Sequence, residues 1–179
     1  MSVRYHNFGG VIGWNLQKYF PMLSSDSYLK LQRSTRNKLQ KEYIDYFLST
    51  GEPPMPLVVN LETINRCNST CSFCTANKNA EKRPYKRMED SLFYSIIDQL
   101  AEWGYTGHLT LYGNNEPFLD TRIVEFHKYC REKLPHSFIF LSSNGLLLTV
   151  DKVKEIIPYV NQLIINNYCR DMKLHDNVR

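Results

Sequence analysis

Val58–Thr75, VVNLETINRCNSTCSFCT, runs from an apolar strand pattern directly into three closely spaced cysteines. Cys67, Cys71 and Cys74 form a C-x3-C-x2-C pattern. Thiolate sulfur binds soft or borderline metals and iron–sulfur clusters, and three such ligands on one short loop can surround a single centre. A closed structural zinc site takes four ligands, whereas a cubane held by three cysteines leaves one iron open. The count of three therefore favours an open iron–sulfur centre.

Two further polar stretches each follow an expected strand. YGNNEP at 112–117 comes after a strand expected at 108–112, and SSNG at 142–145 comes after one expected at 137–142. A glycine lets the backbone approach a ligand closely, and a carboxylate beside it can accept a hydrogen bond from an ammonium group. In parallel strand–helix units the functional loops gather at the carboxyl ends of the strands. The cysteines and both stretches are therefore predicted to meet at one site.

Taken together, the three motifs resemble the signature of the radical S-adenosylmethionine (radical SAM) enzymes. In that family a cysteine loop with an aromatic residue before its last cysteine, here Phe73, follows the first strand of a partial (β/α)6 barrel. The stretch 112–117 looks like the family's G-G-E-P loop, and 142–145 looks like its T-N-G turn. The departure is Asn114-Asn115, which stands where the family often has a second glycine. Asn accepts left-handed backbone geometry better than most residues, so we interpret this as a variation.

The resemblance implies a chemistry. Cys67, Cys71 and Cys74 would hold a [4Fe-4S] cluster whose open iron is chelated by the amino and carboxylate groups of SAM. One electron, from a donor such as flavodoxin or ferredoxin, would cleave SAM to methionine and a 5'-deoxyadenosyl radical. That radical would abstract hydrogen from a substrate, which makes the chain an oxidoreductase. The sequence does not identify the substrate, and a peptide is our preference within the family's range.

The same resemblance assigns SAM contacts. The loop 113–116 is expected at the methionine ammonium, the turn at 143–144 is expected to donate to the SAM carboxylate or ribose, and the residue after a fourth strand at 161–165 is expected at the ribose. Glu116 has an alternative role as a helix cap or a lysine partner, and the turn has one as a plain turn. The expected cofactor-binding residues are Phe73, Gly113, Asn114, Asn115, Glu116, Ser143, Asn144 and Asn166.

Two other functions remain open. In the first, the chain is a non-catalytic module whose cysteines hold zinc with a fourth ligand, Cys130, Cys169 or a histidine such as His108. In the second, it is an inactive radical SAM fragment that keeps the cluster but cannot organise SAM. Disulfides are disfavoured because the chain has five cysteines, an odd number, and no signal-peptide pattern at its start. We therefore expect a reducing compartment, the cytoplasm.

Alternating strand and helix patterns predict an α/β fold. The expected strands are 57–62, 108–112, 137–142 and 161–165, and the expected helices are 88–103, 120–134 and 149–157. By the resemblance, residues 55–179 are expected to form a partial radical SAM core with the first four strands of the barrel and without its last two. Residues 1–54 are expected to be an N-terminal helical extension with a helix at 26–49.

Composition sets the remaining limits. With 179 residues and 42% hydrophobic content, the chain is long enough for a real core. Its formal charge of +4 is mild, and without a nucleic-acid motif it predicts no nucleic-acid partner. No apolar run approaches the roughly 20 residues that span a bilayer, so no membrane role is expected.

Overall fold

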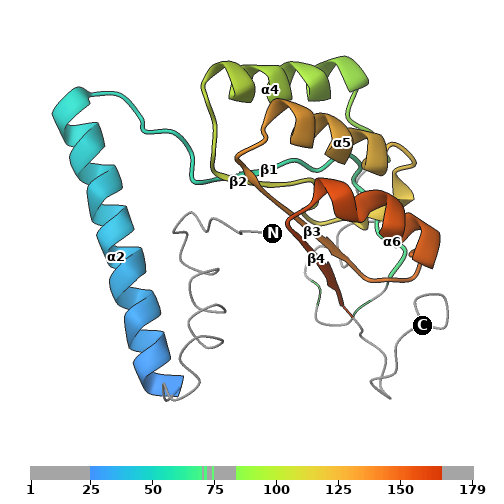
Figure 1. Ribbon diagram of the computed structural model, residues 1–179, viewed down its shortest axis with the longest axis horizontal. Coiled ribbons are helices and arrows are strands. Elements are labelled where there is room, and N and C mark those ends of the chain that lie inside the picture. The colour runs from blue at the N-terminus through green and yellow to red at the C-terminus, as the bar shows by residue number, and fades with distance from the viewer. Residues whose placement is uncertain (1–24, 70, 72–73, 75–83, 167–179) are drawn as a thin grey trace. The chain divides into compact units, whose positions relative to one another are not determined.

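The computed structural model describes residues 25–69, 71, 74 and 84–166. Its contacts divide the chain into two compact units, Met1–Leu57 and Val58–Arg179 (Figure 1). The domain boundary that we expect after residue 54 stays a prediction about domain organisation. Each unit is described by itself below.

The first unit contains one long helix, α2 (Ser25–Thr50), of 26 residues. Gly51 ends it with a φ of 72°, a left-handed conformation that suits glycine, and its backbone N–H donates to the carbonyl of Phe47 at 2.8 Å. The Tyr43 hydroxyl donates to the carbonyl of Pro54 at 2.8 Å, which ties the following segment to the helix. The helix expected at 26–49 is thereby confirmed.

The second unit is built on a four-stranded parallel sheet. Its strands are β1 (Val58–Asn60), β2 (His108–Thr110), β3 (Phe138–Ser143) and β4 (Gln162–Ile165). They lie in the order β1-β2-β3-β4, and every neighbouring pair is parallel. Each strand falls at an expected position, which confirms the α/β class and the four predicted strands.

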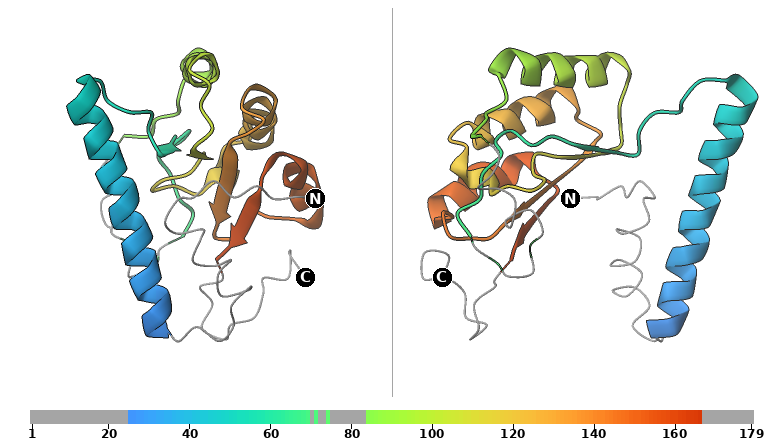
Figure 2. Two further views of the ribbon diagram at one scale, coloured as in Figure 1. Left: turned by 60° about the vertical axis from the view of Figure 1, so that its left-hand side comes forward. Right: turned by 180° about the vertical axis from the view of Figure 1, so that it is seen from behind.

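Three helices cover one face of this sheet (Figures 1 and 2). They are α4 (Asp90–Glu102), α5 (Ile123–Lys133) and α6 (Val150–Ile156). The short 3-10 helix η1 (Pro117–Leu119) lies between β2 and α5, and η2 (Ile157–Tyr159) lies between α6 and β4. The helix expected from residue 120 begins later because the Asp120 carboxylate accepts from the backbone N–H of Arg122 at 3.1 Å and forms a turn there. No helix in the described part of the chain is long and apolar enough to cross a membrane.

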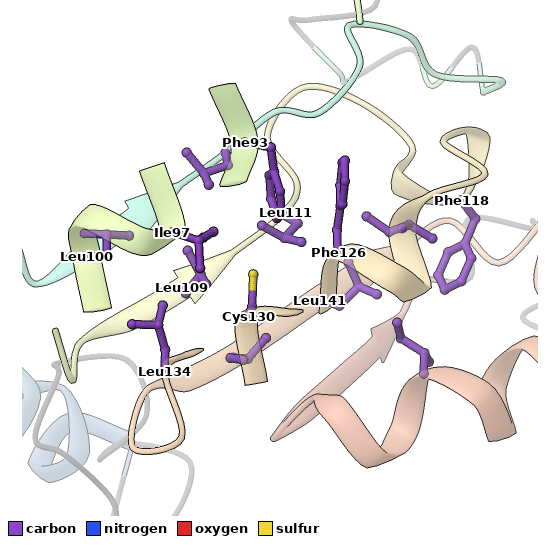
Figure 3. Packing of buried hydrophobic residues seen from close by; sticks show 14 of the residues in the cluster. Phe93, Ile97, Leu100, Leu109, Leu111, Phe118, Phe126, Cys130, Leu134 and Leu141 are labelled. Atoms are coloured by element: carbon purple, nitrogen blue, oxygen red, sulfur yellow. The ribbon is translucent and has the colours of Figure 1, made fainter. Parts of the chain in front are cut away.

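The core lies between these helices and the sheet (Figure 3). Successive strand residues point to opposite faces, so Leu109 and Leu111 of β2 and its carboxyl end enter the core, as Ile139 and Leu141 of β3 do. The rings of Phe93 and Phe126 stack there with centroids 3.8 Å apart. The alternate residues face the other side of the sheet, where Tyr112 and Phe140 make an edge contact at 5.3 Å.

A polar network links the segments at the amino ends of β3 and β4. Arg131 of α5 donates to the carbonyls of Pro135 at 3.0 Å, Ser137 at 3.1 Å and Tyr159 at 3.3 Å. It also donates to the side chain of Asn161, whose Oδ1 accepts from the backbone N–H of Ile139 at 2.8 Å. We call this set the Arg131 network. It ties α5 to the turns that enter β3 and β4.

Candidate functional site

A cavity of about 160 Å³ opens at the carboxyl ends of the strands. Four segments line it, each following a different strand: the cysteine loop after β1, the loop after β2, the turn after β3 and the residue after β4. The lining residues are Cys67, Ser69, Cys71, Cys74, Tyr112, Gly113, Asn114, Asn115, Glu116, Ser142, Ser143, Asn144 and Asn166. Every expected site residue that the structure describes is among them. Phe73 lies outside the described residues.

The three motif cysteines are free, partly buried thiols. The backbone N–H of Ser69 donates to Cys67 Sγ at 3.4 Å, and Asn144 Nδ2 lies 3.8 Å from the same sulfur. Burial raises the pKa of the Cys67 thiol, and the negative charge of Glu116 adds to that effect. A cationic partner such as a metal centre would favour the thiolate form of Cys67.

The three cysteines fit an iron–sulfur cluster, and two candidate fourth ligands of the zinc alternative lie away from them. Cys130, one candidate fourth zinc ligand, is buried in the hydrophobic core on α5. His108 lies at the other end of β2, where its ring stacks on Phe138 at 4.8 Å. Cys169 lies outside the described residues. Among the described residues no three Cys, His, Asp or Glu side chains surround a single metal position, whereas the three cysteines of a cubane ligate different iron atoms.

Asn65 clasps the two ends of the cysteine loop together. Its Nδ2 donates to the carbonyl of Pro84 at 2.8 Å, and its Oδ1 accepts from the backbone N–H of Lys86 at 2.8 Å. A backbone bond from Asn65 N to Lys86 O at 3.1 Å and an antiparallel bridge between Ile64 and Arg87 complete the closure. The two ends of the segment that carries the cysteines are thus held side by side.

Glu116 is 1% exposed, and both of its carboxylate oxygens accept hydrogen bonds. Oε1 accepts from the Ser143 hydroxyl at 2.8 Å and from the backbone N–H of Phe118 at 3.2 Å, while Oε2 accepts from the backbone N–H of Asn144 at 2.8 Å. Burial raises the pKa of this carboxyl, and the three hydrogen bonds oppose the rise. Glu116 thus caps η1, one of its two alternative roles, and also joins the loops after β2 and β3.

Asn144 is the next link. Its Nδ2 donates to Asn68 Oδ1 at 2.8 Å and to Ser69 Oγ at 3.2 Å, so it reaches across to the cysteine loop. Its Oδ1 accepts from the backbone N–H of Leu146 at 2.9 Å, which shapes the turn after β3. Ser143 Oγ accepts from the backbone N–H of Gly145 at 3.0 Å, and Gly145 has the φ of 79° expected in such a turn. The predicted turn is confirmed, and its side chains hold neighbouring loops.

The loop at 113–115 is held by two hydrogen bonds to its backbone. Glu62 Oε1 accepts from the backbone N–H of Asn114 at 2.9 Å, and Asn115 Oδ1 accepts from the backbone N–H of Gly113 at 2.9 Å. A Cβ at Gly113 would lie 3.7 Å from Glu62, an ordinary contact, so the folded chain alone does not require glycine there. The buried Asn115 Nδ2 has no hydrogen-bond partner in the structure. It is a buried donor of this loop for which the described part of the fold gives no use.

Ser69, Tyr112 and Ser142 line the cavity but were not predicted as site residues. Ser142 accepts from Asn166 Nδ2 at 2.6 Å, and the backbone N–H of Asn166 donates to the carbonyl of Ser143 at 2.8 Å. The signal for Tyr112 and Ser142 was the alternation of the strands, because both stand one residue from a core leucine. No sequence signal distinguishes Ser69 from its neighbours.

The chain is similar to proteins of a known family. Residues 61–166, more than half of the chain, match the family model of the Radical SAM superfamily. The curated S-adenosyl-L-methionine-dependent 2-deoxy-scyllo-inosamine dehydrogenase of Niallia circulans is 22% identical over 99 residues, which are 55% of this chain and 39% of that protein.

Two crystal structures of BtrN share the fold. BtrN in complex with AdoMet and 2-DOIA matches with a TM-score of 0.57 and 19% identity, over 63% of this chain and 46% of BtrN. SeMet BtrN in an open conformation matches with a TM-score of 0.58 and 18% identity, over 69% of this chain and 56% of that one. The chain thus spans about two fifths to about half of the length of these relatives.

Proposed function

This chain belongs to the radical SAM superfamily, and from that premise we propose that it binds a [4Fe-4S] cluster and SAM in the cavity at the carboxyl ends of its strands. Cys67, Cys71 and Cys74 are the cluster ligands in this proposal. When bound, the two groups supply one-electron cleavage of SAM and a 5'-deoxyadenosyl radical that takes hydrogen from a substrate.

One observation carries the proposal: three cysteine thiols and the polar loops after β2, β3 and β4 line a single cavity. A closed zinc site would need a fourth protein ligand, and two candidates for it, Cys130 and His108, lie away from the loop. A cluster with an open iron instead needs a neighbouring space for a second ligand. The polar lining beside the cysteines provides that space.

The remaining hydrogen-bonding capacity of the cavity suits the methionine end of SAM. A carboxylate has about four acceptor positions, and the fold uses three of those on Glu116. The one left, on Oε2, is available to an ammonium group. The unpartnered Nδ2 of Asn115 is a donor for a carboxylate. Gly113 and Asn114 offer backbone beside these groups, and Asn166 lies where we place the ribose.

The first test is the content of iron, acid-labile sulfide and zinc per chain after anaerobic reconstitution. We expect about four irons and four sulfides in the wild type. Cys71→Ala should lose them. The matched control is Cys130→Ala, which removes the thiol in the core and should retain the full iron content. Stoichiometric zinc without sulfide, or full iron in Cys71→Ala, would contradict the proposal.

A second measurement separates the active enzyme from an inactive fragment. The reconstituted protein is mixed with SAM and dithionite, and 5'-deoxyadenosine is quantified. Its formation supports the enzyme, whereas iron and sulfide without 5'-deoxyadenosine supports the fragment. We further propose a flavodoxin- or ferredoxin-type donor and, because cluster thiolates must stay reduced, a cytoplasmic location. The peptide substrate stays a prediction.

A further inference from the structure

We propose that Asn144 is a positioning residue that fixes Cys67 within the cysteine loop, and that it is not a donor to SAM. This inference rests on the proposed function, because its effect is read on a cluster that Cys67 ligates. It departs from the role that the sequence suggested for Asn144. The reason is the set of partners that its side chain already has.

The amide nitrogen of Asn144 has no donor left over. A primary amide carries two N–H groups, and those of Nδ2 are directed to Asn68 Oδ1 at 2.8 Å and Ser69 Oγ at 3.2 Å. The Cys67 sulfur lies 3.8 Å from the same nitrogen. The amide oxygen is also used, by the backbone N–H of Leu146. A SAM carboxylate at this nitrogen would have to displace bonds that hold the cysteine loop.

Asn144 is itself held firmly. It is 8% exposed, and its backbone N–H donates to the buried Oε2 of Glu116 at 2.8 Å. Glu116 in turn donates its backbone N–H to the carbonyl of Arg66 at 2.8 Å. The chain on both sides of Cys67 is therefore held in place. Arg66, before it, is held through Glu116, and Asn68 and Ser69, after it, are held through Asn144.

These contacts around Cys67 have an electrostatic consequence for a cluster that Cys67 ligates. The backbone N–H of Ser69 donates to the sulfur, and the partly positive amide group of Asn144 lies 3.8 Å from it. Such hydrogen bonds stabilise the additional negative charge of a reduced cluster and so raise its reduction potential. Removing the Asn144 amide should lower the potential and also loosen the ligand.

The test uses the full chain with its cluster reconstituted, and it is made first without SAM. In Asn144→Ala we expect iron loss to a chelator to become about tenfold faster, the effect typical of residues that orient metal ligands. The midpoint potential, followed by electron paramagnetic resonance, should shift to a lower value. SAM affinity, measured by equilibrium binding, should stay close to that of the wild type.

Two further variants keep the test decisive. Asn68→Ala combined with Ser69→Ala removes the acceptors on the loop and leaves the turn after β3 intact, so it should also speed iron loss even if Asn144→Ala fails to fold. Asn115→Ala is the opposing variant, since its unpartnered Nδ2 lines the cavity. It should weaken SAM binding and leave the SAM-free potential unchanged.

The inference is overturned if Asn144→Ala keeps wild-type iron retention and potential but loses SAM affinity. It is also overturned if the double loop variant retains iron as the wild type does. Failure of the proposed function looks different, because the wild type itself would then assemble no [4Fe-4S] cluster.

Discussion

Two polar networks hold the two ends of the same sheet, and they differ in whether they leave hydrogen-bonding groups unused. At the amino ends, the Arg131 network joins α5 to the turns that enter β3 and β4. At the carboxyl ends, Glu116, Ser143 and Asn144 join the loops after β2 and β3 to the cysteine loop. Both link segments that are far apart in the sequence.

The difference lies in the partners. Arg131 donates mostly to backbone carbonyls, which every sequence offers, and burial lowers the pKa of its guanidinium. The network at the carboxyl ends is built from side chains, lines a cavity with three thiols, and keeps one acceptor position on Glu116. The first network serves the fold, whereas the second can serve both fold and chemistry. Substitutions should separate these two roles.

The largest effect on folding is expected at Arg131. Arg131→Ala leaves several carbonyls and Asn161 without their donor, which should lower the free energy of unfolding by about 2–3 kcal/mol. Urea denaturation of the metal-free protein measures this as a lower midpoint with an unchanged m-value. The exposed Lys128 on the same helix supplies the control, Lys128→Ala, which should change little. A normal midpoint together with loss of iron in Arg131→Ala would break the comparison.

A somewhat smaller effect is expected from pH at His127. Burial, with a contribution from the nearby charge of Arg131, lowers the pKa of this fully buried imidazole to about 4, and its Nδ1 lies 2.7 Å from the carbonyl of Ile123. Below pH of about 6.5 the unfolded chain binds a proton that the folded chain does not, so stability falls as the pH falls. The loss between pH 6.5 and 5 should be about 2 kcal/mol.

The check for His127 is a series of urea denaturations across this pH range. His127→Gln cannot titrate, so the difference in stability between wild type and variant should shrink as the pH falls. Parallel curves would show that the imidazole is not held neutral. At neutral pH the wild type and His127→Gln should have the same iron content, because His127 lies on α5 and does not line the cavity.

The smallest effect on folding is expected at Asn65, where the chemistry should respond more. Asn65→Ala removes three side-chain hydrogen bonds at a partly exposed position, those with Pro84, Lys86 and Arg66, together worth about 1 kcal/mol in unfolding. Iron loss to a chelator should nevertheless become faster, because the ends of the cysteine loop are no longer held together. Asn65→Asp keeps the acceptor for Lys86 and loses the donor to Pro84, so it should fall between. If both variants retained iron as the wild type does, the Asn65 hydrogen bonds would serve folding alone.

The sequence predicted the strands and the contents of the cavity because both depend on local patterns. Apolar runs located β1 to β4, and the motifs that follow them had to meet, since parallel strands present their carboxyl ends together. The internal bonds of the site had no such signal. Asn144 finds Asn68 and Glu116 across long stretches of sequence, and Asn65 finds Lys86 across a loop. Such pairings follow from packing, so a motif could suggest that Asn144 matters but not what it touches.

The closure at Asn65 also bears on how such a protein could be altered over generations or by design. A segment whose ends are pinned at one point exerts little pull on the sheet, and lengthening a closed loop costs only slowly increasing entropy. Insertions or deletions between residues 75 and 83 should therefore be tolerated by the strands on either side, whereas Arg66, Asn68 and Ser69 are tied to Glu116 and Asn144. The stretch after the cysteines is in this sense an interchangeable part, and the same scaffold could carry stretches of different length there.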